Sequence, residues 1–218
     1  MTDSTERLIS SLAADLEPVQ PLPRLRSAFA GVLAVSLAIL GLVLLGDEAQ
    51  SGFASILSDR IYLTSFISLL IAAFAGTTSA LAAAVPGRHR LELGGILVAW
   101  LGLASAALAC LIGMRALGLD APASPAGLDA MCFRRAWLYL LLPAAAILSF
   151  VARGWAAHPL RAASIALLGS GAIGAGIVHA SCGFAAPEHL LIGHLSVPIV
   201  LLLLGLFPSS LILRRIRR

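Results

Sequence analysis

The sequence predicts an all-α membrane protein, a bundle of six transmembrane helices preceded by a short amphipathic helix. Hydrophobic residues make up 59% of the 218 residues and charged residues only 12%, against roughly 45–50% and 25% in an average soluble domain. The mean hydropathy is +0.96. Because the apolar residues run continuously instead of alternating, the pattern is not that of a β-barrel.

Six uncharged stretches are long enough to cross a bilayer, which takes about 17–25 apolar residues in a helix. They cover residues 27–46, 61–85, 93–114, 136–152, 162–178 and 195–213. The first is too long for the apolar core of a signal peptide, and a polar segment, residues 1–26, precedes it. The sequence therefore predicts a transmembrane domain over 27–213 and a basic tail over 214–218.

The arginines predict the orientation, since all 15 basic residues are arginine. If the N-terminus is cytoplasmic, only Arg60, Arg115, Arg134 and Arg135 lie outside. The other eleven are cytoplasmic: Arg7, Arg24, Arg26, Arg88, Arg90, Arg153, Arg161, Arg214, Arg215, Arg217 and Arg218. This bias predicts that both termini are cytoplasmic, with the tail beside anionic lipid. Membrane topology thus explains the high isoelectric point better than nucleic-acid binding does.

Two of the three cysteines are predicted to share the outer side of the membrane. Cys132 precedes the fourth span in "DAMCFRR", and Cys182 follows the fifth. In an oxidising compartment thiols persist as disulfides or are held by metal, so the pair is a static staple, two unpaired thiols, or a sensor of oxidant or thiophilic metal. Sequence does not place their Cα atoms within the roughly 4.4–6.8 Å of a disulfide. Cys110, inside the third span, is expected to be a small buried hydrophobe.

Three histidines accompany Cys182 in the stretch "VHASCGFAAPEHLLIGH". Together, His179, Cys182, His189 and His194 supply the imidazole and thiolate groups that soft or borderline metals accept. Their spacing fits no tight zinc-ligand pattern, and each histidine alone is more often an interfacial hydrogen-bonding residue. A metal bound by these four residues is therefore a weak hypothesis, and no permanent cofactor is expected.

The N-terminal segment predicts a helix over residues 4–17, with Asp3 as its N-cap and Glu6 as the reciprocal partner. A proline-rich linker that begins at Pro18 ends the helix. One apolar stripe follows from 100° per residue, formed by Leu8, Ile9, Leu12 and Leu16. A membrane-surface helix is usually basic on its polar face, whereas this one is mostly acidic. We expect the stripe to bind a groove on a partner protein, with packing on the chain's own cytoplasmic loops as the alternative.

Several activities are disfavoured by what the spans contain. No Asp, Glu, Lys or Arg lies within them as drawn, whereas ion pathways place such residues inside the bundle. The fifth span contains "GSGAIGAG", which is not a phosphate-binding loop because it lies within the membrane. Its glycines instead predict close helix packing; they are Gly169, Gly171, Gly174 and Gly176.

Four motifs together resemble one known family. They are "LISSLAADLEPVQPLPRLR", "VPGRHR" after the second span, the "CF" at Cys132, and "HASC" followed by "PEHLLIGH". These motifs are similar to those of the NrsF-type integral-membrane anti-sigma factors, along nearly the full chain. The resemblance implies a non-enzymatic regulator that holds an extracytoplasmic-function (ECF) sigma factor at the bacterial inner membrane through cytoplasmic segments.

The resemblance also implies that Cys132 and Cys182 are sensing cysteines, which meet heavy metal or oxidative stress and cause the sigma factor to be released. A transient thiophilic metal at the pair is the one cofactor it allows. Two other classes stay open on the residues themselves. One is a membrane thiol oxidoreductase that uses Cys132 and Cys182 with a quinone. The other is a small metal or solute permease that uses His179, His189 and His194.

Overall fold

The computed structural model describes residues 2–14, 21–45, 58–117, 127–154 and 156–216, and these residues form helices and short connections without a strand. The helices are α1 (Thr2–Ala14), α2 (Leu25–Leu44), α4 (Arg60–Ala83), α5 (His89–Leu117), α6 (Leu128–Arg153), α7 (Pro159–Ser181), α8 (Pro187–His189), the π-helix η2 (Leu190–Leu195) and α9 (Ser196–Ile216). Six segments are long and apolar enough to cross a membrane. The predicted class, a helical membrane protein with six spans, is confirmed.

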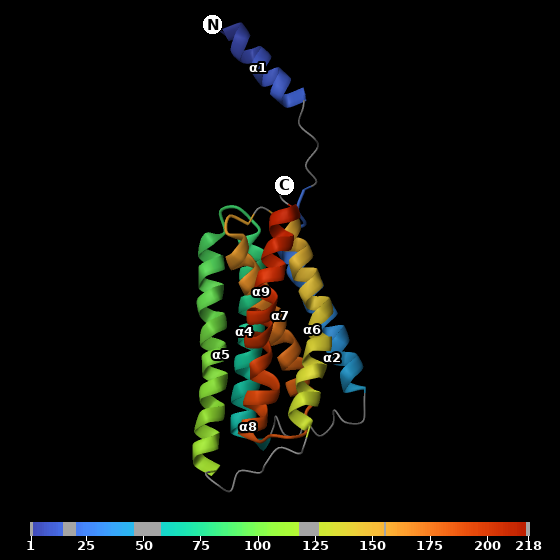
Figure 1. Cartoon of the computed structure of the whole chain (residues 1–218), viewed down its shortest axis with the longest axis vertical. Helices are drawn as coiled ribbons and strands as arrows, with labels where there is room; N and C mark the ends of the chain where they lie inside the picture. The colour runs from blue at the N-terminus through green and yellow to red at the C-terminus, as the bar shows by residue number, and fades with distance from the viewer. Residues whose placement is uncertain (1, 15–20, 46–57, 118–126, 155, 217–218) are drawn as a thin grey trace.

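The long helices run up and down in one bundle, and α1 stands apart from it (Figure 1). At the end of the bundle nearer to α1, helices α5 and α7 begin; we call it the proximal end. At the opposite, distal end, α4 and α6 begin, α7 ends and the short α8 lies (Figure 1). Segments far apart in sequence therefore meet at the distal end.

Helix α7 is the centre of the bundle and is buried along almost all of its length. Its glycines allow backbones to approach closely. A Cβ on Gly169 would lie 2.8 Å from the backbone of α4, and one on Gly171 would lie 2.5 Å from the backbone of α9. A Cβ on Gly174 would strike the backbone of α6, whereas one on Gly176 would meet only a leucine methyl group at 4.0 Å. The prediction of close packing is correct at three of these glycines and unnecessary at Gly176.

All six spanning segments begin before their predicted spans, and three of them begin at least four residues early. Helix α5 begins at His89 instead of 93, α6 at Leu128 instead of 136, and the last spanning segment at Pro187 instead of 195. The predicted ranges stopped at charged or polar residues, but a helix continues through such residues when their side chains find partners or reach the interface.

The spans as drawn contain no Asp, Glu, Lys or Arg, but helix α5 begins before its drawn span and includes Glu92. This residue lies in the first turn of α5 and its side chain is 8% exposed. Its carboxylate accepts a bond of 2.6 Å from Arg161 Nε on α7, which explains how a charge is tolerated there. The hydroxyl of Ser79 on α4 donates to the Glu92 backbone carbonyl at 2.6 Å. The cluster ties α4, α5 and α7 together at the proximal end.

Helix α1 begins at Thr2, so Asp3 lies in its first turn and not at the predicted N-cap position. The described helix ends at Ala14, and Leu16 falls outside the described residues. Leu8, Ile9 and Leu12 are 59–60% exposed. The described part of the apolar stripe is therefore uncovered in the isolated chain, contrary to the alternative in which it packs on the chain's own loops.

Candidate thiol and imidazole site

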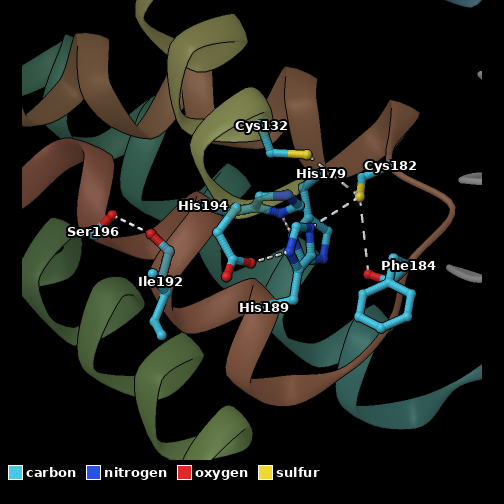
Figure 2. A network of polar contacts seen from close by, with 9 residues as sticks. Cys132, His179, Cys182, Phe184, His189, Ile192, His194 and Ser196 are labelled. Carbon is cyan, nitrogen blue, oxygen red and sulfur yellow. Dashed lines mark hydrogen bonds and ion pairs between the residues drawn. The ribbon is translucent and has the colours of Figure 1, made fainter. Parts of the chain in front are cut away.

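The two predicted sensor cysteines meet at the distal end. Cys132 lies in the second turn of α6 and Cys182 directly follows the last residue of α7. Both are buried free thiols, and their Sγ atoms are 3.8 Å apart (Figure 2). The expectation that they share one end of the protein is correct. Cys110 is fully buried in α5 and belongs to a hydrophobic cluster that also includes Leu190, as expected of a small hydrophobe.

His189 and His194 both lie beside Cys182 because the chain forms a π-helix, η2, directly after His189. His189 ends α8 and His194 lies in η2, five residues further on. Five residues of α-helix would turn these side chains about 140° apart, whereas the wider π turn, with its i to i+5 bonds, brings them to one side. Gly193 gives the turn room, since a Cβ there would lie 3.3 Å from His189 Cε1. Both imidazoles are fully buried beside Cys182 (Figure 2).

His189 links Cys182 to a carboxylate that the sequence analysis did not single out. Its Nε2 lies 3.2 Å from Cys182 Sγ, and its Nδ1 lies 2.5 Å from Asp129 Oδ1. Asp129 precedes Cys132 by three residues on α6, which places both on one face of that helix. An acidic residue in a first helical turn has an ordinary explanation in the helix dipole. The i, i+3 spacing between Asp129 and Cys132 was the feature of the sequence that could have pointed to Asp129 as part of the site.

His179 stands behind His194 and has contacts at both ring nitrogens. Its Nδ1 is 3.1 Å from His194 Nδ1, and its Nε2 is 3.2 Å from both the Tyr62 carbonyl oxygen and Ser65 Oγ. The other ring nitrogen of His194, Nε2, is buried and has no hydrogen-bond partner among the residues that the structure describes.

Tyr62 of α4 holds the end of α7 against the site. Its hydroxyl lies 2.5 Å from the carbonyl oxygen of His179 and 2.6 Å from that of Cys182. Carbonyl groups at the end of a helix lack partners within the helix, so this buried hydroxyl satisfies groups that would otherwise be unpaired. Nothing in the sequence pattern pointed to Tyr62, because it is one tyrosine within an apolar span.

Four side chains converge as possible ligands. One donor atom from each of Cys132, Cys182, His189 and His194 lies within 4.8 Å of the others, and all four residues are buried. The set predicted from sequence had His179 where the structure has Cys132. His179 contacts the ligand candidate His194 from behind. A metal at either set stays a prediction.

The electrostatic surroundings make Cys182 the more reactive thiol. The hydrogen bond from the Cys132 thiol, together with the bond to His189, lowers the pKa of the Cys182 thiol, although burial opposes this. A thiolate beside an imidazole that is oriented by a carboxylate is the arrangement that activates a cysteine nucleophile. A cavity lined by Met131, Arg135 and Phe184 lies against both cysteines.

The fold and this site define a class of protein, a helical membrane protein with a buried pair of thiols and an imidazole cluster at one end of the bundle. A family model described as "NrsF: Negative regulator of sigma F" matches residues 12–214, nearly the whole chain. The chain belongs to the NrsF family, and the resemblance seen in its motifs is confirmed.

Membership of this family makes the protein a negative regulator of a sigma factor, which agrees with the prediction of a regulator. No match was found among curated proteins or solved structures.

Proposed function

We propose that this protein is an anti-sigma factor of the bacterial inner membrane, which holds an ECF-type sigma factor on the cytoplasmic side and releases it when Cys132 and Cys182 react with a thiophilic metal or an oxidant. The family supports regulation of a sigma factor, and the six apolar helices support a membrane location. The observation that carries the sensing step is the buried sulfur pair, 3.8 Å apart.

The arginine distribution supports a cytoplasmic proximal end and a periplasmic distal end. Arg88 and Arg90 lie around the start of α5, and Arg153 and Arg161 flank the connection from α6 to α7, all at the proximal end. The positive-inside rule places such residues in the cytoplasm. Both termini are then cytoplasmic, and the thiol pair faces the oxidising periplasm.

The exposed apolar stripe of α1 supports a protein partner on the cytoplasmic side. Leu8, Ile9 and Leu12 are more than half exposed on a helix whose polar face is not basic. An amphipathic helix of this kind binds a hydrophobic groove through residues at i, i+3 and i+4 spacing. We propose that the groove belongs to the sigma factor, and that the protein does not itself contact nucleic acid.

Helix α7 is the proposed path from the sensor to the cytoplasmic side. Its distal end carries Cys182 and is held by the Tyr62 hydroxyl, and its proximal end carries Arg161, which is paired with Glu92. Its close backbone contacts leave it little freedom to bend, so a displacement of Cys182 moves the helix as a unit. A hundredfold loss of affinity for the sigma factor requires a coupling of about 2.7 kcal/mol.

The reaction at the pair is either metal bridging or a two-electron oxidation. In the oxidation, the sulfur atoms of Cys132 and Cys182 form one S–S bond and lose two protons and two electrons to an oxidant such as a peroxide. Both reactions replace a contact of 3.8 Å by a shorter or bridged one. The end of α7 is thereby pulled toward α6.

A co-purification experiment tests the proposal. The tagged protein is solubilised in mild detergent, and bound proteins are identified by mass spectrometry before and after treatment with cadmium or peroxide. We expect a sigma factor to be retained at rest and released on treatment. The double variant Leu8→Asp, Leu12→Asp should lose it, whereas Ser10→Asp, on the opposite face of α1, should retain it. No sigma factor with the native protein, or equal retention by the double variant, contradicts the proposal.

One observation favours a second candidate, the thiol oxidoreductase. Cys182, His189 and Asp129 form the thiol, imidazole and carboxylate chain that activates a nucleophile. A quinone-dependent enzyme carries a bound chromophore, so the absorbance spectrum of the purified protein separates the two functions. The permease has no such support, because Glu92 is engaged by Arg161.

A further inference from the structure

We propose that Cys132, Cys182, His189 and His194 bind one zinc ion in the resting protein, and that the inducing metal or oxidant acts by removing it. The geometry of the four side chains supports the site, and its regulatory role rests on the proposed function. The positions of the protons on the histidine rings decide which nitrogen atoms carry the lone pairs that bind a metal.

The hydrogen bonds of His179 fix the tautomer of His194. The Tyr62 carbonyl oxygen only accepts, so His179 Nε2, 3.2 Å away, carries a proton. In its neutral form the His179 ring then has a lone pair on Nδ1. His194 Nδ1, at 3.1 Å, must therefore donate to it. It follows that His194 Nε2 carries a lone pair and no proton.

The same reasoning applies to His189. Asp129 Oδ1 accepts at 2.5 Å, so the Nδ1 atom of His189 carries the proton. Nε2, 3.2 Å from Cys182 Sγ, is then the nitrogen that shares a proton with the thiol, and its lone pair binds a metal once that proton has left. Each imidazole thus has its rear nitrogen held by a partner and presents Nε2 forward. This is how metal-binding histidines are usually oriented by the residues behind them.

The unpaired lone pair on His194 Nε2 is the observation that indicates a bound ligand. His194 is fully buried, and its Nε2 has no hydrogen-bond partner among the described residues. A buried polar atom without a partner carries a free-energy cost. A bound cation removes that cost directly, since a lone pair is what it coordinates.

The distances agree with a tetrahedral ion. With zinc–sulfur bonds of about 2.3 Å and zinc–nitrogen bonds of about 2.0–2.1 Å, tetrahedral geometry separates two sulfur ligands by about 3.8 Å and a sulfur from a nitrogen by about 3.6 Å. The Cys132 and Cys182 sulfurs are 3.8 Å apart, and the sulfur of Cys182 is 3.2 Å from His189 Nε2. One donor atom from each of the four residues lies within 4.8 Å of the others. The sulfur–sulfur distance therefore fits as it stands, the Cys182–His189 pair must separate by about 0.4 Å, and any separation near the 4.8 Å limit must close by about 1 Å to reach tetrahedral bonding.

The donor set selects the ion. Two thiolates with two imidazoles in a tetrahedron are typical of zinc, whereas magnesium and calcium require oxygen ligands. Zinc binding displaces the proton from each thiol and needs no electron transfer. All four protein positions are filled, which is typical of a structural or regulatory site and not of a catalytic one.

Such an ion joins three segments that are separate in sequence. Cys132 belongs to α6, Cys182 to the end of α7, and the two histidines to the turn before α9. A softer ion such as cadmium competes for the two thiolates. A peroxide converts the two thiolates and two protons to one disulfide and two water molecules, and zinc leaves. Either reaction ends the zinc cross-link between the segments.

Metal analysis of the purified full-length protein tests the site. The protein is solubilised in mild detergent without chelator, and zinc is measured per chain by mass spectrometry. We expect about one zinc per chain, and a loss of about tenfold or more in Cys132→Ser, His189→Ala and His194→Ala. Cys110→Ser and His158→Ala, matched changes away from the site, should keep the zinc. Asp129→Asn should bind about tenfold more weakly, as second-shell changes do.

Cobalt provides an independent readout when it replaces zinc. Tetrahedral cobalt with thiolate ligands shows visible absorption and a sulfur-to-metal band in the near ultraviolet, and peroxide should abolish both. Native protein with no zinc and no cobalt spectrum overturns the proposal, with water as the partner of His194. Copper or iron in place of zinc also overturns the proposal, and so does full retention of zinc by His194→Ala.

Sigma-factor capture from the same preparation separates this inference from the proposed function. Zinc without sigma factor leaves the site standing and overturns the function. Sigma factor released by cadmium from a zinc-free protein supports the function and overturns the resident ion.

Discussion

The two ends of α7 each carry a buried polar cluster, and the clusters differ in how completely their members are paired. At the proximal end, Arg161 and Glu92 neutralise each other at 2.6 Å. At the distal end, the chain of contacts through His179 ends at a His194 nitrogen that has no hydrogen-bond partner in the described part of the chain, beside two free thiols. In the proximal cluster the opposite charges are paired with each other. The distal cluster has sulfur and nitrogen atoms that can still bind a ligand.

The difference shows which cluster is structural and which is reactive. A satisfied ion pair gains nothing from a ligand, and its loss leaves an uncompensated charge. Thiols and lone pairs enclosed together are different, because a metal or an oxidant changes their bonding without breaking an existing pair. We therefore expect changes at the proximal cluster to alter stability, and changes at the distal cluster to alter the response.

The largest effect is expected from loss of the thiol pair. The double variant Cys132→Ser, Cys182→Ser removes both sulfur atoms, so cadmium or peroxide should no longer release the sigma factor. The hundredfold change in affinity, about 2.7 kcal/mol, should vanish. Affinity of solubilised protein for the sigma factor, with and without inducer, measures this. Cys110→Ser is the control, and an unchanged response in the double variant contradicts the sensing role.

The second-largest effect is expected from Glu92→Ala, which should lower the stability of the folded protein. It leaves the Arg161 charge without its partner, which costs about 3–5 kcal/mol at a fully buried site. Because the Arg161 side chain is 32% exposed, we expect about 2 kcal/mol. Thermal unfolding in detergent should show a lower Tm, with release by inducer retained. Arg90→Ala, at an exposed position in the same helix, should leave Tm unchanged. If Glu92→Ala kept its Tm but no longer released the sigma factor, the proximal cluster would belong to the response and not to stability.

Tyr62→Phe should have a smaller effect that links stability to the site. It removes the hydroxyl bonded to the carbonyl oxygens of His179 and Cys182, and leaving a buried polar group unpaired costs about 1–3 kcal/mol. We expect a lower Tm and a faster reaction of Cys182 with a thiol reagent, since the end of α7 is less restrained. Tyr139→Phe on α6 is the control. Equal reaction rates in the two variants would show that the hydroxyl does not restrain Cys182.

Ser65→Ala should have the smallest effect. The Ser65 hydroxyl lies 3.2 Å from His179 Nε2, which also contacts the Tyr62 carbonyl oxygen. The variant loses one of the two contacts of His179 Nε2, which should lower the free energy of unfolding by about 0.5–1.5 kcal/mol. A small decrease in Tm relative to Ser164→Ala measures it. A larger loss than that of Tyr62→Phe would show that the serine, and not the carbonyl, orients His179.

Features that depend on a one-dimensional pattern are predicted correctly from the sequence. The count of apolar stretches predicts the number of spans, and alternation of direction then predicts that Cys132 and Cys182 lie at the same end. Glu92 was left outside the third span, because a span drawn by the absence of charge stops at a charged residue even when the helix continues through it and the charge is paired. Asp129 was also missed, since an acidic residue in a first helical turn has an ordinary explanation.

Hydropathy and motifs alone predict a six-span membrane protein of the NrsF family with two cysteines at one end of the bundle. Which side chains meet at that end depends on the three-dimensional packing. The π turn aligned His189 with His194, and packing around α7 brought Cys132 to Cys182 and placed His179 behind His194. The physical reason is that hydropathy fixes how far along the membrane normal a residue lies. Its lateral neighbours depend on helix rotation and packing, which no local pattern encodes.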